Sequence, residues 1–470
     1  MAPPSPSFAP RRPAALALVM TGVLLSTMDS GMVNVALPTI MTAMAAGLDA
    51  AGLVVTVYLL TITATLVFWG RLADRFGRWA TYRAGLLVFA VGAACCALSP
   101  GLNLLLFSRG IQGLGAAMMM ATGPAIIRQA FPLGRLGRSI GMVGMATAGG
   151  LLTGPLVGGL LLAGFSWRAI FLLPVPLCLL AFLLGRLFHE DVDRHRVGEA
   201  APFDWPGSCC WLLLVLLWVG TLQRLDSLAT GTVFLLLLLF LTTLLLFLWL
   251  ENRAVAPVLP LGLFARRYFS VAVGTAALSF AVLFAVLILI PFYLEYVLGQ
   301  PVVVVGQVMM AVPVTLIFLA PWSGRLYDRI GARVLTSAGL AISALALGGL
   351  ALLPTEGSLV RLVVLLALLG AGQSIFLTPN SASVLGRVDE QYLGVSAGIL
   401  ATARNFGMVS GAALALALFS FFLSSYGGGL SLSDFTAADR QVFLHALRAT
   451  FAGMAGLAVV GALLSLCRPR

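Results

Sequence analysis

Long apolar runs, separated by short polar or glycine-containing connections, recur along the whole chain. A helix needs about 20 apolar residues to cross a bilayer, and fourteen runs come close to that length. These runs cover residues 14–36, 52–70, 80–98, 103–126, 138–162, 168–188, 205–223, 229–250, 268–292, 303–323, 333–353, 360–380, 394–423 and 444–466. The longest polar connections, 189–204 and 425–441, leave no room for a sizeable soluble domain. The pattern therefore predicts an all-α integral membrane protein with 14 spans.

A short glycine- and arginine-rich turn occurs twice. Residues 70–80 read GRLADRFGRWA and residues 324–334 read GRLYDRIGARV; we call them the first and second Gly-Arg turns. A further match pairs Gly115 and Pro124 with Gly370 and Pro379. The number of residues from the first Gly-Arg turn to the second exceeds the length of six helices with their loops. Two helices are therefore predicted to be inserted between two similar halves. The predicted domains are a six-helix bundle (1–190), a cytoplasmic linker with two inserted helices (191–260) and a second six-helix bundle (261–470).

Composition and charge support the membrane class. The chain is 60% hydrophobic and 10% charged, which a soluble domain does not tolerate. All 28 basic residues are arginines, and the net charge is +11. If the N-terminus is inside, 21 arginines fall on the inner side and 5 on the outer side. This bias predicts that both termini are cytoplasmic, and it explains the net charge without a nucleic-acid partner.

The chain also lacks the patterns that enzymes and ATP-driven pumps require. It contains no phosphate-binding P-loop and no candidate catalytic triad. The six cysteines lie within apolar runs or at the end of one, with no CxxC pair. We therefore expect a protein that is not an enzyme and that has no metal site and no cofactor.

Two oppositely charged residues lie inside predicted spans. Asp29 is in the first span, where a carboxylate is functional by default. Arg109 is in the fourth span, with Gln112 on the same face. Both charges lie at a depth of roughly 10 Å, and a buried cation beside a buried anion costs less than either alone, so they are expected to pair. The residues expected to share the polar face of the first span are Ser26, Asp29, Ser30 and Asn34. A purely structural acid is the alternative for Asp29.

Several motifs together resemble the major facilitator superfamily, most closely its fourteen-helix drug:proton antiporters. Besides the Gly-Arg turns, they read MDSGMVNVALPTI (28–40), RGIQGLGAA (109–117) and GLLTGPLVGG (150–159). The resemblance covers nearly the whole chain. It implies two six-helix bundles that rock about a central substrate path.

The resemblance also implies roles for the motif residues. Asp29 and Arg109 would couple transport to protons. A gating loop would comprise Gly70, Asp74, Arg75, Gly77, Arg78 and, in the second turn, Asp328. An antiporter motif, which accompanies export in relatives, would comprise Gly150, Gly154, Pro155, Gly158 and Gly159. The predicted substrate cavity comprises Ser26, Ser30, Asn34, Gln112, Glu295, Arg404 and Asn405.

Some positions keep two interpretations. Glu295 is either an interfacial carboxylate or a second proton or cation site. Arg404 either extends towards the cytoplasm or lines the cavity beside Asn405. Val364 stands where Arg109 would map in the twelfth span, so the second half is expected to lack this cation.

The sequence thus predicts a proton-coupled exporter of small amphiphilic compounds or drugs in the bacterial inner membrane, of the multidrug efflux and antibiotic resistance type. Its partners would be the substrate, protons and membrane lipid, and a periplasmic adaptor is left open. Two alternatives remain: a proton-coupled uptake symporter of a small organic solute, and a non-transporting membrane scaffold or receptor.

Overall fold

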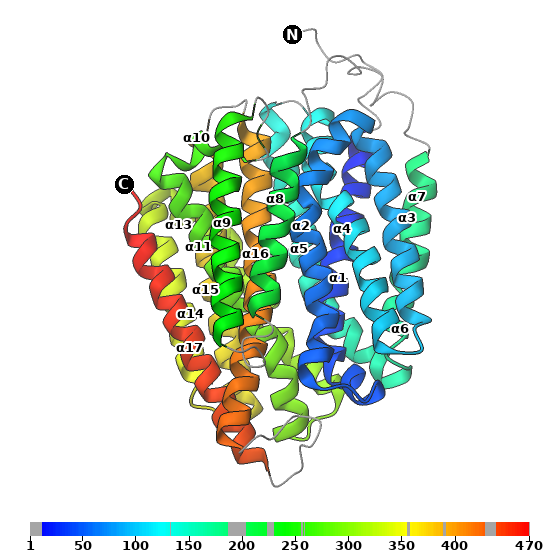
Figure 1. The fold of residues 1–470 in the computed structure, drawn as a ribbon, viewed down its shortest axis with the longest axis vertical. Coiled ribbons are helices and arrows are strands. Elements are labelled where there is room, and N and C mark those ends of the chain that lie inside the picture. Colours follow the sequence, from blue (N-terminus) through cyan, green and yellow to red (C-terminus); the bar gives the residue numbers. More distant parts are fainter. Residues whose placement is uncertain are drawn as a thin grey trace.

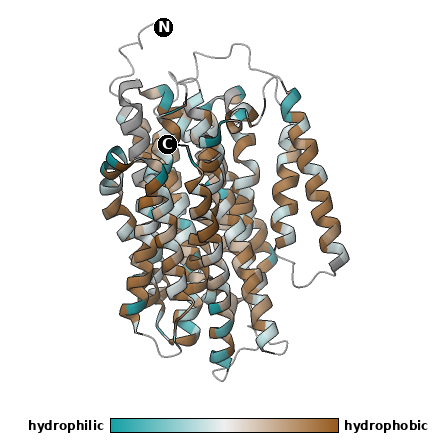
Figure 2. Ribbon diagram, turned by 90° about the vertical axis from the view of Figure 1, so that its left-hand side faces the viewer, coloured by the Kyte–Doolittle hydropathy of each residue, from teal (hydrophilic) through white to brown (hydrophobic). Residues whose placement is uncertain are grey.

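The computed structural model describes residues 12–131, 133–186, 204–222, 230–254, 257, 259–354, 358–388, 392–427 and 439–469. Within these ranges the chain is helical, and the helices run side by side along the long axis of the molecule (Figure 1). Figure 2 shows hydrophobic residues along the length of the helices and hydrophilic ones gathered towards the ends. This distribution suits a bundle that is surrounded by lipid along its sides.

Seven helices form what we call the N-terminal half. They are α1 (Arg12–Ala43), α2 (Leu48–Phe76), α3 (Arg78–Ala97), α4 (Leu102–Ala130), α5 (Leu133–Gly164), α6 (Ala169–Leu172) and α7 (Pro174–Arg186). The closest neighbours are α3 with α4, α1 with α5, and α2 with α4. Because α1 contacts α4 as well as α5, it lies between these two helices, in the interior of this half.

The C-terminal half repeats these packing relations. Its elements are α10 (Leu261–Phe264), α11 (Arg267–Phe292), the π-helical turn η2 (Tyr293–Val297), α12 (Val302–Met309), α13 (Ala311–Ile330), α14 (Ala332–Leu350), α15 (Leu359–Leu385), α16 (Leu393–Tyr426) and α17 (Arg440–Leu466). Here α11 packs on α16, and α14 packs on α15. The two halves meet where α2 contacts α16 and where α5 contacts α12 and α13.

The inserted pair, α8 (Trp205–Leu222) and α9 (Thr230–Arg253), packs against both halves through α8 (Figure 1). The Trp211 indole donates to the Thr63 carbonyl of α2 at 3.2 Å, and the Trp218 indole donates to Ser410 Oγ of α16 at 2.9 Å. Side chains of α9 such as Phe234 and Leu235 are exposed, as expected of a lipid-facing helix. The inserted helices therefore cover the seam between the halves on one side.

Twelve helices in the described ranges are long and apolar enough to cross a membrane. The predicted fifth and sixth spans correspond to two shorter apolar helices, Gly149–Gly164 and Ala169–Gly185. The first half of α5 carries Arg135 and Arg138, which shortens its apolar part. The sixth is interrupted after Leu172, where Pro174 starts a new helix. The total of 14 spans stays a prediction.

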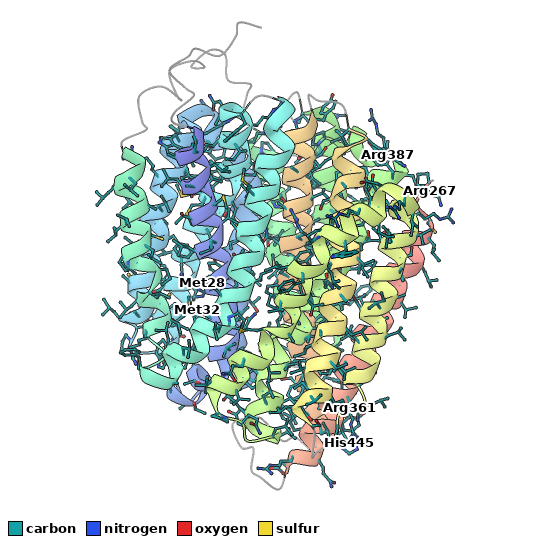
Figure 3. All side chains as sticks on the ribbon, turned by 180° about the vertical axis from the view of Figure 1, so that it is seen from behind. Met28, Met32, Arg267, Arg361, Arg387 and His445 are labelled. Atoms are coloured by element: carbon teal, nitrogen blue, oxygen red, sulfur yellow. The ribbon has the colours of Figure 1, made fainter. Side chains whose placement is uncertain are left out.

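The two ends of the bundle differ in charge. Figure 3 labels Arg267 and Arg387 at one end, and Arg361 and His445 at the other. We call the first the arginine-rich end, because both Gly-Arg turns and their arginines also lie there, and the second the far end. That the arginine-rich end faces the cytoplasm stays a prediction.

The internal repeat aligns differently from the prediction. A pair of glycines on α4 packs closely on α2 and α3, and a matching pair on α15 packs on α13 and α14. The pairs are Gly113 with Gly115, and Gly370 with Gly372. Gly113 therefore corresponds to Gly370, and Gly115 to Gly372, so the predicted match of Gly115 with Gly370 is wrong. The cause is that the stretch from these glycines to the following proline is two residues longer in α4 than in α15. The counterpart of Arg109 becomes the buried Leu366 instead of the exposed Val364.

Candidate functional site

The expected pairing of Asp29 with Arg109 is present in the structure. Arg109 Nη1 lies 2.7 Å from Asp29 Oδ2, and both side chains are fully buried. They come from α1 and α4, which pack against each other. A charge in the interior of a membrane protein needs such a partner, because the surroundings cannot solvate it.

Gln112 completes a three-residue network. Its amide nitrogen donates to Asp29 Oδ1 at 2.8 Å, and its amide oxygen accepts a hydrogen bond from Arg109 Nη1 at 2.7 Å. Arg109 Nε also donates to the Val54 carbonyl of α2 at 2.9 Å. Each carboxylate oxygen of Asp29 therefore has one donor. The i, i+3 spacing on α4 places Arg109 and Gln112 on one face, as predicted.

Two aromatic rings flank the arginine. The guanidinium carbon lies 4.1 Å from the ring centroid of Tyr58 and 5.6 Å from that of Phe171. Such cation–π contacts partly replace hydration. The Tyr58 hydroxyl lies 3.0 Å from Ser26 Oγ, which ties Ser26 to the same network. Sequence reasoning assigned no role at the site to Tyr58 or Phe171, because their contacts with Arg109 depend on how helices distant in sequence pack together.

A narrow cavity lies next to the network, between the two halves. Its walls come from α1, α5, α11, α12 and α13, and its volume is about 20 Å³. Ser30 and Asn34 of α1 line it, whereas Ser26, Asp29 and Gln112 do not. Of the four polar residues of α1 predicted to share one face, Ser30 and Asn34 line the cavity, Asp29 pairs with Arg109 and Ser26 contacts Tyr58. One residue along a helix turns by about 100°, so Ser30 faces the cavity while Asp29 faces α4.

The glycine motif of α5 packs against α1 and against the other half. A Cβ atom on Gly154 would lie 2.7 Å from the Met28 carbonyl oxygen. Gly150 and Gly158 approach α1 in the same way, and Pro155 lines the cavity. A Cβ atom on Gly159 would lie 3.3 Å from Gly306 Cα of α12. The motif therefore serves two helix contacts, one of them across the seam.

The Gly-Arg turns connect α2 to α3 and α13 to α14. Gly77 and Gly331 occupy equivalent positions with φ values of 96° and 84°, which other residues rarely adopt. Gly70 is helical, and a Cβ atom there would meet no atom within 4 Å, so neither a turn nor close packing requires a glycine at this position.

The charged residues of the turns differ in their surroundings. Arg71 donates to the Pro257 carbonyl, which joins α2 to the segment after α9. Arg75 and Asp328 are exposed, and Arg78 is partly buried. The side chain of Asp74 lies outside the described part of the structure.

The remaining predicted residues lie away from the network. Glu295 is on η2 near the far end; it is partly buried, and its Oε1 atom is enclosed without a hydrogen-bond partner in the described ranges. Arg404 is partly buried on α16. The Asn405 amide donates to the Ala401 carbonyl of its own helix at 2.9 Å, and neither Arg404 nor Asn405 lines the cavity.

Sequence reasoning also missed Arg468, which is 2% exposed near the C-terminus. It donates to Ser383 Oγ at 3.1 Å and to Asn380 Oδ1, both on α15. Burial, with Arg387 as a second cause, lowers the pKa of Arg468 to about 10. Its position after a terminal apolar run gave no signal for burial.

Comparison with known proteins agrees with this architecture. The sequence profile of the Major Facilitator Superfamily matches residues 19–412. The riboflavin transporter RibZ of Clostridioides difficile is 32% identical, with 96% of each chain covered. The multidrug resistance protein Stp of Mycobacterium tuberculosis is 31% identical, with 88% of this chain and 77% of Stp covered. The crystal structure of a bacterial homolog to the human lysosomal transporter Spinster matches with a TM-score of 0.69 at 16% identity, covering 98% of this chain and 97% of the other.

Proposed function

The chain belongs to the Major Facilitator Superfamily and is a multi-pass membrane transporter, not an enzyme, and we propose that it exports small amphiphilic compounds in exchange for protons. The observation that carries this proposal is the buried network of Asp29, Arg109 and Gln112 beside a cavity between the halves. The bias of arginines supports a location in the bacterial inner membrane with both termini in the cytoplasm.

In this proposal the shorter helices Gly149–Gly164 and Ala169–Gly185 are the fifth and sixth of 14 spans. Residues 1–190 and 261–470 then form the two bundles, and residues 191–260 the inserted region. The contact of Gly159 with Gly306 holds the halves together near the far end. Alternating access requires this contact to separate while the arginine-rich ends approach. The predicted gating loop, with Asp74 and Asp328, would stabilise one of these states.

Proton coupling would act through Asp29. A proton that reaches Asp29 removes the negative charge that holds Arg109, and it leaves a cation buried without its partner. Removing one partner of a buried pair costs about 3–5 kcal/mol, so the sealed arrangement becomes unfavourable. A conformation in which water reaches Arg109 would then be favoured, and the contacts of α1 with α4 would rearrange. Proton entry from the outer side would give the cycle its direction.

The relatives supply two kinds of candidate substrate, riboflavin and drugs. Stp is named as a multidrug resistance protein, and the glycine motif of α5 resembles that of exporters. RibZ, a riboflavin transporter, matches over 96% of both chains, so riboflavin-like compounds are the first substrates to test. This match also makes a proton-coupled uptake symporter of a small organic solute the second candidate.

The test is transport in proteoliposomes of known orientation with an imposed pH gradient. Export predicts that riboflavin or a drug moves against the direction of proton flow, and that Asp29→Asn abolishes the dependence on the gradient. Asp49→Asn, at the first turn of α2, is the control that removes a carboxylate elsewhere. Movement of substrate and protons in the same direction would establish the symporter instead.

A further inference from the structure

The cavity between the halves is almost entirely apolar. Figure 3 places Met28 and Met32 of α1 about midway along the bundle, which is the level of the cavity. The side chains that face it from the C-terminal half are all apolar and include Leu283, Phe284 and Met309. Its volume of about 20 Å³ has room for about one water molecule, so a substrate can enter only when these walls separate.

No charged side chain lines the cavity within the described ranges. The nearest charged groups along α1 and α4, Asp29 and Arg109, are fully buried and neutralise each other. Both oxygens of Asp29 already accept hydrogen bonds. A charged ligand in the cavity would lose its hydration without gaining a counter-charge, which is unfavourable in an apolar site.

The two polar side chains of the cavity both present acceptors. The amide oxygen of Asn34 is buried and has no hydrogen-bond partner in the described part of the chain. The Ser30 hydroxyl donates to the Ser26 carbonyl at 3.5 Å, which leaves its lone pairs for another group. Buried polar atoms normally have partners, so an unpartnered oxygen on a residue of the cavity wall needs an explanation. A ligand that brings a donor supplies it.

We propose that this cavity binds an uncharged compound with an apolar body, and that an N–H or O–H group of the compound donates a hydrogen bond to Asn34. This inference rests on the proposed function, because it assigns the substrate class of the same transporter. The apolar walls of α11 to α13 would enclose the body of the compound, and Asn34, with Ser30 beside it, would fix its orientation. Selection would thus depend on a donor group and not on charge.

The test compares two fluorescent compounds that differ only in the group on the imide nitrogen, 1,8-naphthalimide (N–H) and N-methyl-1,8-naphthalimide (N–CH₃). Both are uncharged and flat, but only the first carries an N–H donor. Binding to the purified full chain is measured by fluorescence titration. The wild type is expected to bind the N–H compound about tenfold more tightly, since its methylated analogue leaves the acceptor unpaired. Asn34→Leu is expected to remove this preference, whereas Asn103→Leu, at an exposed asparagine of α4, keeps it.

Equal binding of the two compounds by the wild type would overturn the inference, and this comparison needs no variant to fold. A preference that survives in Asn34→Leu would also overturn it, as would tighter binding of the cationic dye ethidium than of either imide. Transport is measured separately in proteoliposomes. A donor preference without proton-linked transport would reject the proposed function alone, and proton-linked transport without a donor preference would reject the inference alone.

Discussion

Replacing Asp29 by asparagine is the most direct perturbation of the buried network. The substitution keeps the size and shape of the side chain but removes its charge. Asp29 now accepts hydrogen bonds from Arg109 at 2.7 Å and from Gln112 at 2.8 Å. An asparagine offers one acceptor oxygen and one NH₂ donor group, whereas Arg109 and Gln112 both present donors to this position. The asparagine NH₂ group would therefore face another donor, either the guanidinium or the glutamine NH₂ group. The variant therefore imitates protonated Asp29 permanently, with one contact made worse.

The size of the effect follows from the burial of the pair. Both side chains are fully buried, and Arg109 Nη2 has no hydrogen-bond partner in the described ranges. Removing one member of such a pair costs about 3–5 kcal/mol. At about 1.4 kcal/mol for each factor of ten, the sealed arrangement loses about two to three and a half orders of magnitude in population relative to an arrangement with hydrated Arg109.

Proton release in weakly buffered detergent solution is the assay. Purified wild-type protein is expected to release protons when riboflavin or another substrate is added, because the proposed exchange couples substrate binding to deprotonation of Asp29. Asp29→Asn is expected to bind the substrate with no release and no dependence of affinity on pH. Substitution of Arg109 by glutamine in the same chain should restore part of the lost thermal stability, because it removes the unpaired cation. Equal proton release by the wild type and Asp29→Asn would refute this reasoning and move the coupling group elsewhere.

Three further outcomes are expected. Gly154→Leu should strongly reduce the yield of folded protein in size-exclusion profiles, because the new Cβ atom would lie 2.7 Å from a backbone oxygen of α1. Gly70→Ala should raise the free energy of unfolding by about 0.5–1 kcal/mol, as seen in thermal melts, because Gly70 is helical with open space around it. Glu295→Gln should release as many protons on substrate addition as the wild type, because Glu295 lies outside the α1–α4 network; a smaller number would make it a second proton site. The lowered pKa of Arg468 means that burying its charge lowers the free energy of unfolding fully below about pH 10, and less as the pH rises further. Thermal melts should therefore show the wild type gaining stability relative to Arg468→Gln above that pH. A constant difference between the two would show that the side chain stays hydrated.

The network shows what a sequence can and cannot reveal about such a site. Asp29 and Arg109 were predicted to pair because depth in a membrane follows directly from the number of residues to the end of a span. The rotation of α1 about its axis was not predictable, because it depends on which neighbours pack on each face. For this reason Ser30 and Asn34 reach the cavity while Ser26 joins Tyr58.

Gly77 and Gly70 of the first Gly-Arg turn likewise show what a sequence can and cannot reveal. Gly77 could be assigned from its place in a turn between two apolar runs, and its φ of 96° agrees. Gly70 belongs to the same motif but lies inside α2 with open space around it. A motif identifies a segment, whereas the physical demand on each of its glycines depends on backbone conformation and on neighbours that are distant in sequence.

The halves share a fold but not the charged network. Leu366 and Leu369 of α15 occupy the positions equivalent to Arg109 and Gln112, and both are fully buried. Packing alone is therefore satisfied by leucine at this level of the bundle, and the fold has no need of a cation there. An arginine in the N-terminal half imposes a desolvation cost that only a paired carboxylate offsets. That the second half avoids this cost with the same architecture supports the proposal that the ion pair acts in a change of state and not in stability. In that proposal the C-terminal half is the apolar wall against which the change opens or closes the cavity.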